Sequence, residues 1–278
     1  MMLNISFGIR LFILVLGLAI LFAAPAKAGE QYVFSVVPQF ERRMLFAIWQ
    51  PIIDELEKRT GLTFQLTTSL SVSDYESDVV KGQYDFVYIN PYLMPNIEHT
   101  PGYLPLVRDR NPLFGILVVR KDSPYNRVED LQGKALAVPS MSALGASLLL
   151  RAELERQFQV KMRPVVAKTH SSVFLHVLNG FADAGGSVQK ALSEQEARVR
   201  DSLRVLHRTR EVPSHPVAVH KRVPLAVREK VRHAFIEMSA SEEGRRLLAR
   251  VPMQEAVAAS AEDYHVLRAL KLDTYLQN

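Results

Sequence analysis

The chain has 278 residues, of which 48% are hydrophobic and 23% charged, and it contains no cysteine. This composition excludes a disordered chain, a collagen-like repeat and a small domain held together by disulfides. The formal charge of +5 is modest and its Lys and Arg are scattered among carboxylates, so we expect no nucleic-acid partner. At this length two lobes are expected rather than a single core.

The first 28 residues differ in kind from the rest. Arg10 precedes an uncharged run from Leu11 to Ala26, and Ala26-Lys27-Ala28 has the small-x-small pattern of a signal-peptidase site. The run is shorter than the roughly 20 apolar residues of a membrane span. We therefore expect residues 1–28 to be a signal peptide cleaved after Ala28, and the mature protein to be periplasmic. A retained N-terminal anchor is the alternative.

The first half of the mature chain predicts three strands separated by two helices. Segments 32–37, 63–67 and 86–89 are apolar and have the length of buried strands. Residues 41–59 carry apolar side chains at helical spacing, and 74–81 predict a shorter helix. Buried strands that alternate with helices favour an α/β fold with a mainly parallel sheet flanked by helices.

The second half continues this alternation. Strands are predicted at 115–120, 134–138, 165–167, 182–184, 203–206 and 217–220, and helices at about 142–158 and 224–250. We therefore expect two α/β lobes, with residues 29–112 and 220–278 in lobe one and residues 113–219 in lobe two. The two crossings, near Leu113 and Val219, predict a two-strand hinge, and the lobes on either side of it predict a ligand cleft.

Polar residues gather where predicted strands run into helices. Asn90-Pro91, 139–142, 169–172 and 185–187 all occupy such junctions. Helix N-termini expose unpaired N–H groups and carry partial positive charge, so several that meet at a cleft would bind an anion without Lys or Arg. Helix capping alone is the alternative for each Ser or Asn.

A series of short motifs accompanies these junctions. In chain order they are Ser73-Asp74-Tyr75, GQYDFVY at 82–88, VRKDSP at 119–124, DLQGK at 130–134, Pro139-x-x-Ser142-x-x-Gly145, His170, GFADA at 180–184 and VPSHP at 212–216. In this order and spacing the chain resembles the periplasmic solute-binding proteins of phosphonate and phosphite ABC importers, which have the two-lobed type II binding fold. The resemblance implies that Tyr75, Ser142 and His170 hold the phosphonate oxygens and that an importer permease is the partner.

The sequence departs from the family pattern in the expected pocket. Ser142-Ala143-Leu144 stands where the family has Ser-Thr-Ser, and His215 stands where binders of aminoalkyl phosphonates carry a carboxylate. We therefore do not expect 2-aminoethylphosphonate as the ligand. The expected ligand is a phosphonate, phosphite or phosphate-like oxyanion or a small organic acid. Its expected contacts are Tyr75, Tyr88, Asn90, Tyr92, Ser142, His170, Ser171, Ser172 and His215, with Phe114 in the cleft and Arg42 or Arg43 as further candidates.

Two other functions are consistent with such a chain. A ligand-sensing partner of a membrane histidine kinase would have the same fold and cleft. A hydrolase is the other alternative, because Ser171 adjoins His170, but neighbouring residues point in different directions and the sequence has no G-x-S-x-G or H-E-x-x-H pattern. We expect a monomer without catalytic activity, cofactor or metal, whose affinity for an anion rises as pH falls through about 6.5 and its two cleft His become charged.

Overall fold

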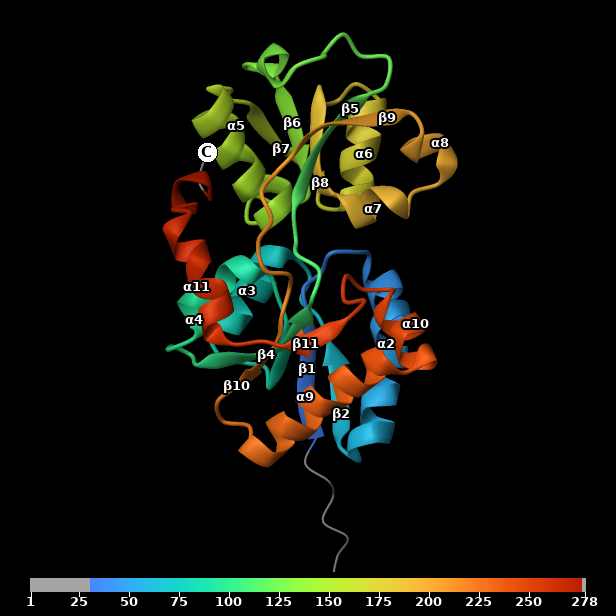
Figure 1. Cartoon of the computed structure of the whole chain (residues 1–278), viewed down its shortest axis with the longest axis vertical. Helices are drawn as coiled ribbons and strands as arrows, with labels where there is room; N and C mark the ends of the chain where they lie inside the picture. The colour runs from blue at the N-terminus through green and yellow to red at the C-terminus, as the bar shows by residue number, and fades with distance from the viewer. Residues whose placement is uncertain (1–30, 277–278) are drawn as a thin grey trace, which may run out of the picture. The chain divides into compact units, whose positions relative to one another are not determined.

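The computed structural model describes residues 31–276, which form one compact unit. The predicted signal peptide, residues 1–28, lies outside the described residues. The unit contains two separate β-sheets with helices packed around each, so the expected two-lobed α/β fold is confirmed (Figure 1).

Lobe one is built on a six-stranded sheet. The strand order is β11-β4-β10-β3-β1-β2, with β1 (Gln31–Val36), β2 (Thr63–Thr67), β3 (Phe86–Tyr88), β4 (Tyr103–Asp109), β10 (Val217–His220) and β11 (Ala256–Ala258). Its helical segments are α2 (Arg42–Thr60), α3 (Val72–Val80), η1 (Pro91–Leu93), α4 (Met94–Ile97), α9 (Leu225–Ala240), α10 (Glu242–Leu248), α11 (Ala261–Ala269) and η4 (Asp273–Tyr275).

Lobe two is built on a five-stranded sheet. The strand order is β7-β6-β8-β5-β9, with β5 (Gly115–Arg120), β6 (Ala135–Val138), β7 (Arg163–Val166), β8 (Ala184–Val188) and β9 (Leu203–Arg208). Its helical segments are η2 (Val128–Leu131), η3 (Leu144–Leu149), α5 (Leu150–Phe158), α6 (His170–Leu178), α7 (Gln189–Ser193) and α8 (Ala197–Arg200). The π-helical turn η3 runs directly into α5.

The sheets are mixed, whereas the sequence predicted mainly parallel ones. In lobe one β1 pairs in parallel with β2 and β3, but β10 is antiparallel to β3 and β4. The reason is the path of the chain, which leaves lobe one after β4 and returns through β10. Because β10 pairs with β3 and β4, residues 217–219 belong to the sheet of lobe one and not to lobe two, where the sequence placed them.

The two segments that cross between the sheets lie side by side, and the return crossing is at Val212 and not near Val219, where the sequence placed it. The backbone N–H of Leu113 donates to the carbonyl of Val212, and the N–H of Val212 donates back to Leu113, both at 2.8 Å. This antiparallel bridge joins the outgoing and returning segments between the two sheets.

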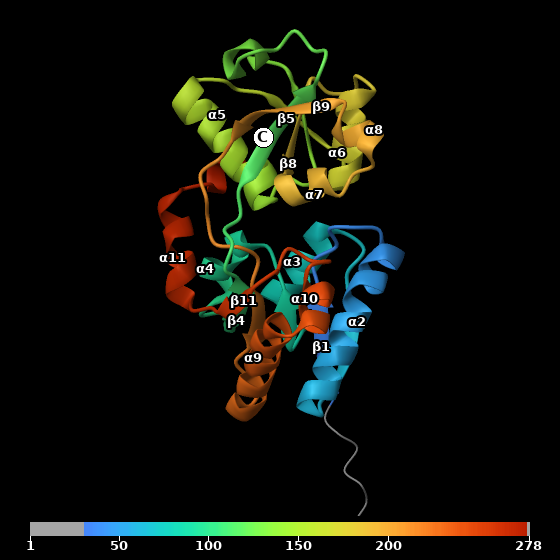
Figure 2. The same cartoon turned by 45° about the vertical axis from the view of Figure 1, so that its right-hand side comes forward.

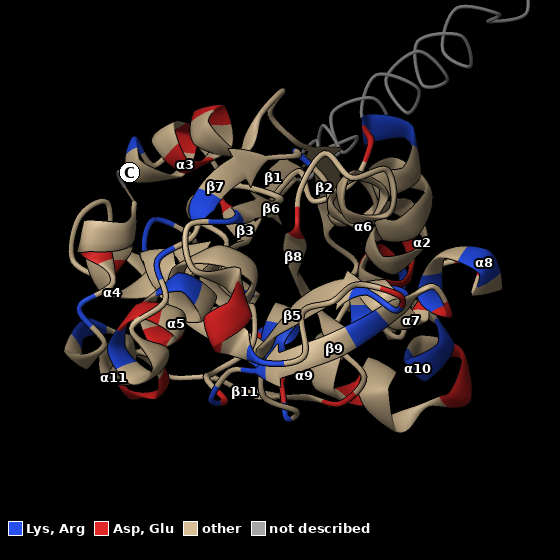
Figure 3. Cartoon of the chain, turned by 90° about the horizontal axis from the view of Figure 1, so that it is seen from above, with Lys and Arg blue, Asp and Glu red and all other residues tan. Residues whose placement is uncertain are grey.

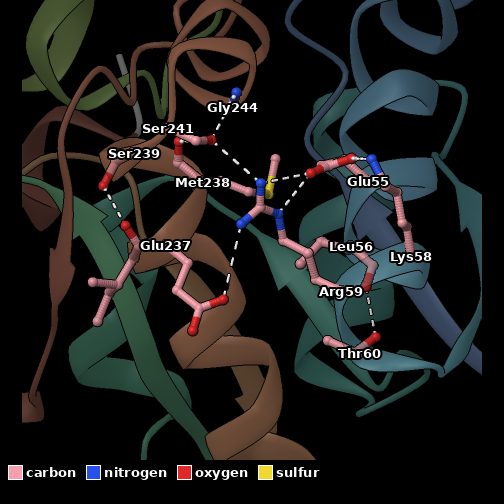
Figure 4. Close-up of polar contacts among 11 residues, drawn as sticks. Glu55, Leu56, Lys58, Arg59, Thr60, Glu237, Met238, Ser239, Ser241 and Gly244 are labelled. Carbon is pink, nitrogen blue, oxygen red and sulfur yellow. Dashed lines mark hydrogen bonds and ion pairs between the residues drawn. The ribbon is translucent and has the colours of Figure 1, made fainter.

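The helix predicted over 224–250 is two helices that meet at Ser241. Ser241 has an extended backbone (φ −95°, ψ 151°). Its hydroxyl accepts a hydrogen bond from the N–H of Gly244 and so caps the N-terminus of α10. Arg59 of α2 fixes this junction, because its guanidinium contacts Ser241 at 3.3 Å, Glu237 at 3.8 Å and Glu55 at 2.6 Å (Figure 4). Burial opposes the charge of Glu55, but hydrogen bonds from Arg59 and Lys58 outweigh it and lower the pKa of that carboxyl.

Acidic and basic residues both occur on the surface helices, whereas β9 carries Arg and no carboxylate (Figure 3). On α8, for example, Arg198 pairs with Glu196 at 2.8 Å and Arg200 pairs with Asp201 at 2.9 Å. Within residues 31–276 no helix combines the length and apolar character needed to cross a bilayer.

Candidate functional site

Three adjoining cavities lie between the lobes. The central one has a volume of about 50 Å³ and is lined from both lobes and the hinge. A cavity of about 370 Å³ shares His170, His215 and Leu113 with it, and one of about 720 Å³ shares Ser140 and Lys168. Among the described residues 31–276, the central lining contains no carboxylate. It consists of Val37, Pro38, Gln39, Val72, Asn90, Leu113, Pro139, Ser140, Ala143, Leu144, Gly145, Ala146, Lys168, His170, Val188 and His215.

Two helix N-termini contribute their first turns to this central cavity. Residues 143–146 line it at the start of η3, and His170 lines it as the first residue of α6. The first N–H groups of a helix have no partner within the helix and carry partial positive charge. The two helix starts therefore give the central cavity donors suited to an oxyanion.

Glycines allow η3 to pack directly against the sheet of lobe two. A Cβ at Gly186 of β8 would lie 2.0 Å from the carbonyl oxygen of Ala146, and a Cβ at Gly115 of β5 would lie 2.0 Å from that of Gly145. The sequence placed 185–187 at a strand-to-helix junction, but these residues lie inside β8. Their contribution is the close approach of η3, which fixes where its N-terminus lies.

His170 and His215 both line the central cavity. Nδ1 of His170 lies 2.9 Å from the Ser187 hydroxyl, and Nε2 of His215 lies 3.1 Å from the side-chain nitrogen of Gln39. Burial lowers the pKa of His170 to about 4, and burial together with His170 lowers the pKa of His215 to about 3. Both rings are neutral at pH 7, so the charge change predicted near pH 6.5 is wrong for this structure.

The three predicted tyrosines lie in the core of lobe one instead of in the cleft lining. The Tyr75 hydroxyl donates to the Tyr88 carbonyl at 2.9 Å, and the Tyr92 hydroxyl donates to Asp273. Tyr88 stacks on His215 with ring centroids 5.5 Å apart, and its buried hydroxyl has no hydrogen-bond partner among residues 31–276. Burial raises the pKa of all three hydroxyls. None of them lines the three cavities, so we do not retain them as ligand contacts.

Asn90 and Ser142 join the two lobes directly. The side-chain amide of Asn90 donates to the Ser142 carbonyl at 2.5 Å, and its oxygen caps η1 by accepting from the N–H of Tyr92. The Ser142 hydroxyl donates to Glu76 of α3 at 2.8 Å and lines the 720 Å³ cavity. Burial raises the pKa of Glu76, and the hydrogen bond from Ser142 partly offsets this effect.

Ser171 and Ser172 belong to the start of α6 and do not line these cavities. Ser171 is exposed and accepts a hydrogen bond from Gln195 at 3.3 Å, while the N–H of Ser172 donates to the capping hydroxyl of Thr169 at 3.1 Å. Capping was the alternative that the sequence left open for these serines, and the structure shows the cap between Thr169 and Ser172.

The structure also shows where the remaining candidates for the cleft, Phe114, Arg42 and Arg43, lie. Phe114 lines the 370 Å³ cavity and lies under the Arg208 guanidinium, 3.6 Å from ring centroid to Cζ. Arg42 lines the 720 Å³ cavity, whereas Arg43 lines none of the three.

Most lining residues were not predicted from the sequence, and two charged ones, Lys168 and Glu76, matter most for an anion site. Lys168 is the one Lys or Arg in the central lining, and its φ of +73° places it in a left-handed turn before α6. Its position beside the predicted junction at 169–172 was the available signal. Glu76 was missed because it follows Tyr75 in the motif and its charge gave no reason to place it near an anion site. In the described part of the chain, no group of three His, Cys, Asp or Glu is arranged to hold a metal ion.

Several solved structures share this architecture. The chain resembles a binding protein component of an ABC phosphonate transporter from Pseudomonas aeruginosa, with 14% identity over 87% of this chain and 86% of the other and a TM-score of 0.75. It also resembles PhnD1 from Prochlorococcus marinus in complex with methylphosphonate, with 11% identity over 89% and 99% of the two chains and a TM-score of 0.79. A protein of Xanthomonas citri bound to ATP gives 17% identity over 89% and 97% and a TM-score of 0.70. These likenesses establish the two-lobed binding fold.

The family follows from the sequence. Residues 34–264 match the model of the family described as "ABC transporter, phosphonate, periplasmic substrate-binding protein". Because the match covers most of the chain, the chain belongs to this family of substrate-binding proteins, and the family predicted from the sequence motifs is confirmed. A sensor partner of a membrane kinase is not favoured by this match.

Proposed function

We propose that the interlobe cleft binds the oxyanion group of a phosphonate, phosphite or phosphate-like ligand and delivers it to an ABC importer. One observation carries the proposal: the starts of η3 and α6 meet at a cavity lined by Lys168, His170 and His215 and by no carboxylate. Family membership and a structural neighbour whose complex holds methylphosphonate support the ligand class.

In this proposal the lining residues have different tasks. The contact between Ser187 and Nδ1 of His170 orients the ring, and in the tautomer in which the Ser187 hydroxyl donates to Nδ1, Nε2 carries the proton and donates to an oxyanion. Lys168 supplies the positive charge, and the helix N–H groups supply fixed donors. A central volume of about 50 Å³ suits a small headgroup, and the adjoining cavities leave room for an organic substituent.

The remaining properties follow from this function. A protein that captures and releases its ligand by moving two lobes needs no catalytic group, and we propose that it acts as a monomer with an importer permease as its membrane partner. We further propose that it reaches the periplasm by cleavage after Ala28.

Thermal unfolding of the purified protein tests the ligand class. The protein is refolded from denaturant to remove carried ligand and is then titrated with methylphosphonate, phosphite, phosphate, sulfate and small carboxylates. A ligand present at about 100 times its Kd adds about 2.7 kcal/mol to the free energy of unfolding. We expect such a shift with a phosphorus oxyanion, a loss of the shift in His170→Ala, and an unchanged shift in the exposed neighbour Ser171→Ala.

Two results would contradict the proposal. A shift with carboxylates alone would show that the ligand is a small organic acid and not a phosphorus oxyanion. No shift with any anion in the panel would show that the cleft does not bind anions.

A further inference from the structure

A fourth cavity lies away from the cleft, between α5, the start of β7 and η4. Its volume is about 750 Å³, and it shares no lining residue with the three cleft cavities. The lining residues are Arg151, Leu154, Glu155, Val160, Lys161, Met162, Arg163, Pro164, Thr274 and Tyr275. We call it the α5–η4 cavity.

The α5–η4 cavity has a buried arginine in its wall. Arg151 is only 8% exposed, and its Nη2 donates to the carbonyls of Met141 and Tyr275. Its Nε is shielded from solvent and has no hydrogen-bond partner, and no carboxylate pairs with Arg151 within the described residues 31–276. The Arg151 guanidinium also lies over the Tyr275 ring, with 5.9 Å from Cζ to the ring centroid. Two carbonyls and an aromatic face therefore surround this buried cation, and an ion pair with a residue of 31–276 does not offset its desolvation.

The other charged residues around the cavity are mostly basic. Lys161 and Arg163 are exposed and line it beside Arg151, and among residues 31–276 Glu155 is the one carboxylate in the lining. Glu155 lies beside Tyr275, where burial and then this carboxylate raise the pKa of the Tyr275 hydroxyl. Three basic side chains against one acid leave the cavity positive.

The cavity is closed on one side by a segment that comes from lobe one. After α11 the chain runs to α5 of lobe two, as both Figure 1 and Figure 2 show. Asp273 accepts from Tyr92 of lobe one, while Arg156 of α5 donates to the carbonyls of Leu270 and Lys271 at 2.7 and 2.9 Å. A ligand in this cavity would therefore touch both α5 and the C-terminal segment of lobe one.

We propose that the α5–η4 cavity is a second anion site, which binds a small tetrahedral oxyanion such as phosphate or sulfate beside Arg151. The oxyanion would balance the buried guanidinium and contact Lys161 and Arg163, since planar guanidinium groups and oxyanions form strong charge-assisted hydrogen bonds. By bridging α5 and η4 it would also strengthen the attachment of the C-terminal segment to lobe two. This site does not depend on the function proposed for the cleft.

Equilibrium dialysis with radiolabelled inorganic phosphate separates the two sites. The background is the variant His170→Ala with His215→Ala, which disables the cleft but leaves the α5–η4 cavity intact. We expect this variant to retain one bound phosphate per chain. Adding Lys161→Gln and Arg163→Gln should weaken that binding at least tenfold, because each lost charge removes a charge-assisted contact.

A control variant loses the same number of positive charges at positions away from the α5–η4 cavity. Lys230→Gln with Arg246→Gln removes two exposed positive charges of lobe one and should change phosphate binding less than twofold. Phosphate binding that is absent from the cleft-disabled variant, or that falls equally in the control, would overturn the second site. Thermal unfolding of each variant without phosphate checks that the chain still folds.

Discussion

The cleft and the α5–η4 cavity differ in the groups that we propose bind an anion. Around the central cleft the N–H groups of two helix starts and the neutral rings of His170 and His215 are the candidate donors, and Lys168 supplies the formal positive charge. Around the α5–η4 cavity the positive potential comes from formal charges, including buried Arg151, which pairs with no carboxylate among residues 31–276. Helix dipoles are fixed in place by the fold, whereas long basic side chains adapt to different anions. The cleft should therefore discriminate between anions, whereas the α5–η4 cavity should bind different oxyanions with similar affinity.

The largest expected effect comes from moving the helix start in the cleft. Gly186→Ala places a Cβ 2.0 Å from the Ala146 carbonyl oxygen, so η3 must shift away from β8. We expect the free energy of unfolding to fall by about 3 kcal/mol or more and ligand binding in the cleft to be lost. Urea unfolding and thermal shift with ligand measure both effects.

The control for this prediction is Gly133→Ala. A Cβ at Gly133 meets nothing within 4 Å, although its φ of +74° makes alanine mildly strained there. A cost of about 1 kcal/mol is expected from the backbone alone. If Gly186→Ala costs no more than this control, close packing does not position η3.

The second effect is a loss of stability in acid. The folded-state pKa of His170 is about 4 and that of His215 about 3, both below the ordinary value of 6.5. At a pH between 6.5 and the folded-state pKa, each His is protonated in the unfolded chain but not in the folded one. The free energy of unfolding should therefore fall as pH drops from 6.5 toward 4, by up to roughly 3 kcal/mol for His170.

Variants identify the source of this acid sensitivity. His170→Gln with His215→Gln should flatten the dependence of unfolding free energy on pH between 6.5 and 4. His233→Gln changes an exposed His on α9 and should leave the dependence unchanged. If the unfolding free energy changes with pH equally in the wild type and the double variant, the pKa values of these two His are not lowered in the folded protein.

Salt sharpens the comparison between the sites. Raising NaCl from about 20 to 200 mM shortens the Debye length and screens exposed charges such as Lys161 and Arg163. We expect phosphate binding in the α5–η4 cavity to weaken several-fold and binding in the cleft to weaken less than twofold. Dialysis of the cleft-disabled variant and of Lys161→Gln with Arg163→Gln measures each site separately. Equal salt dependence at the two sites would contradict the distinction between dipoles and formal charges.

The smallest effect concerns the contact between the lobes. Asn90→Ala removes the 2.5 Å hydrogen bond to the Ser142 carbonyl. The free energy that favours contact between the lobes should fall by about 1 kcal/mol. Calorimetry should show a two- to fivefold weaker affinity in the cleft. Asn96→Ala, at an exposed position on α4, is the control and should leave the affinity unchanged.

Much of the fold was predictable because its signals are local. The apolar strands 32–37 and 115–120 and the helix around 41–59 follow from periodicity alone, and each appears within a residue or so of its predicted bounds. Strands β4 and β11 were missed. Pro105 interrupts the strand pattern of β4, and β11 is only three residues long, Ala256–Ala258. The antiparallel pairing of β10 depends on where the chain returns, which local sequence does not encode.

The sequence by itself determined the family, the two lobes and the helix starts that form the central cavity, because motif order and hydrophobic period are properties of neighbouring residues. Only the tertiary structure decided which polar groups meet. It placed Tyr75 and Tyr92 in the core, brought Lys168 to the central cavity, and set Glu76 against Ser142 across the cleft. Contacts between residues far apart in the chain depend on the packing of whole elements, and burial then sets the pKa values of His170 and His215.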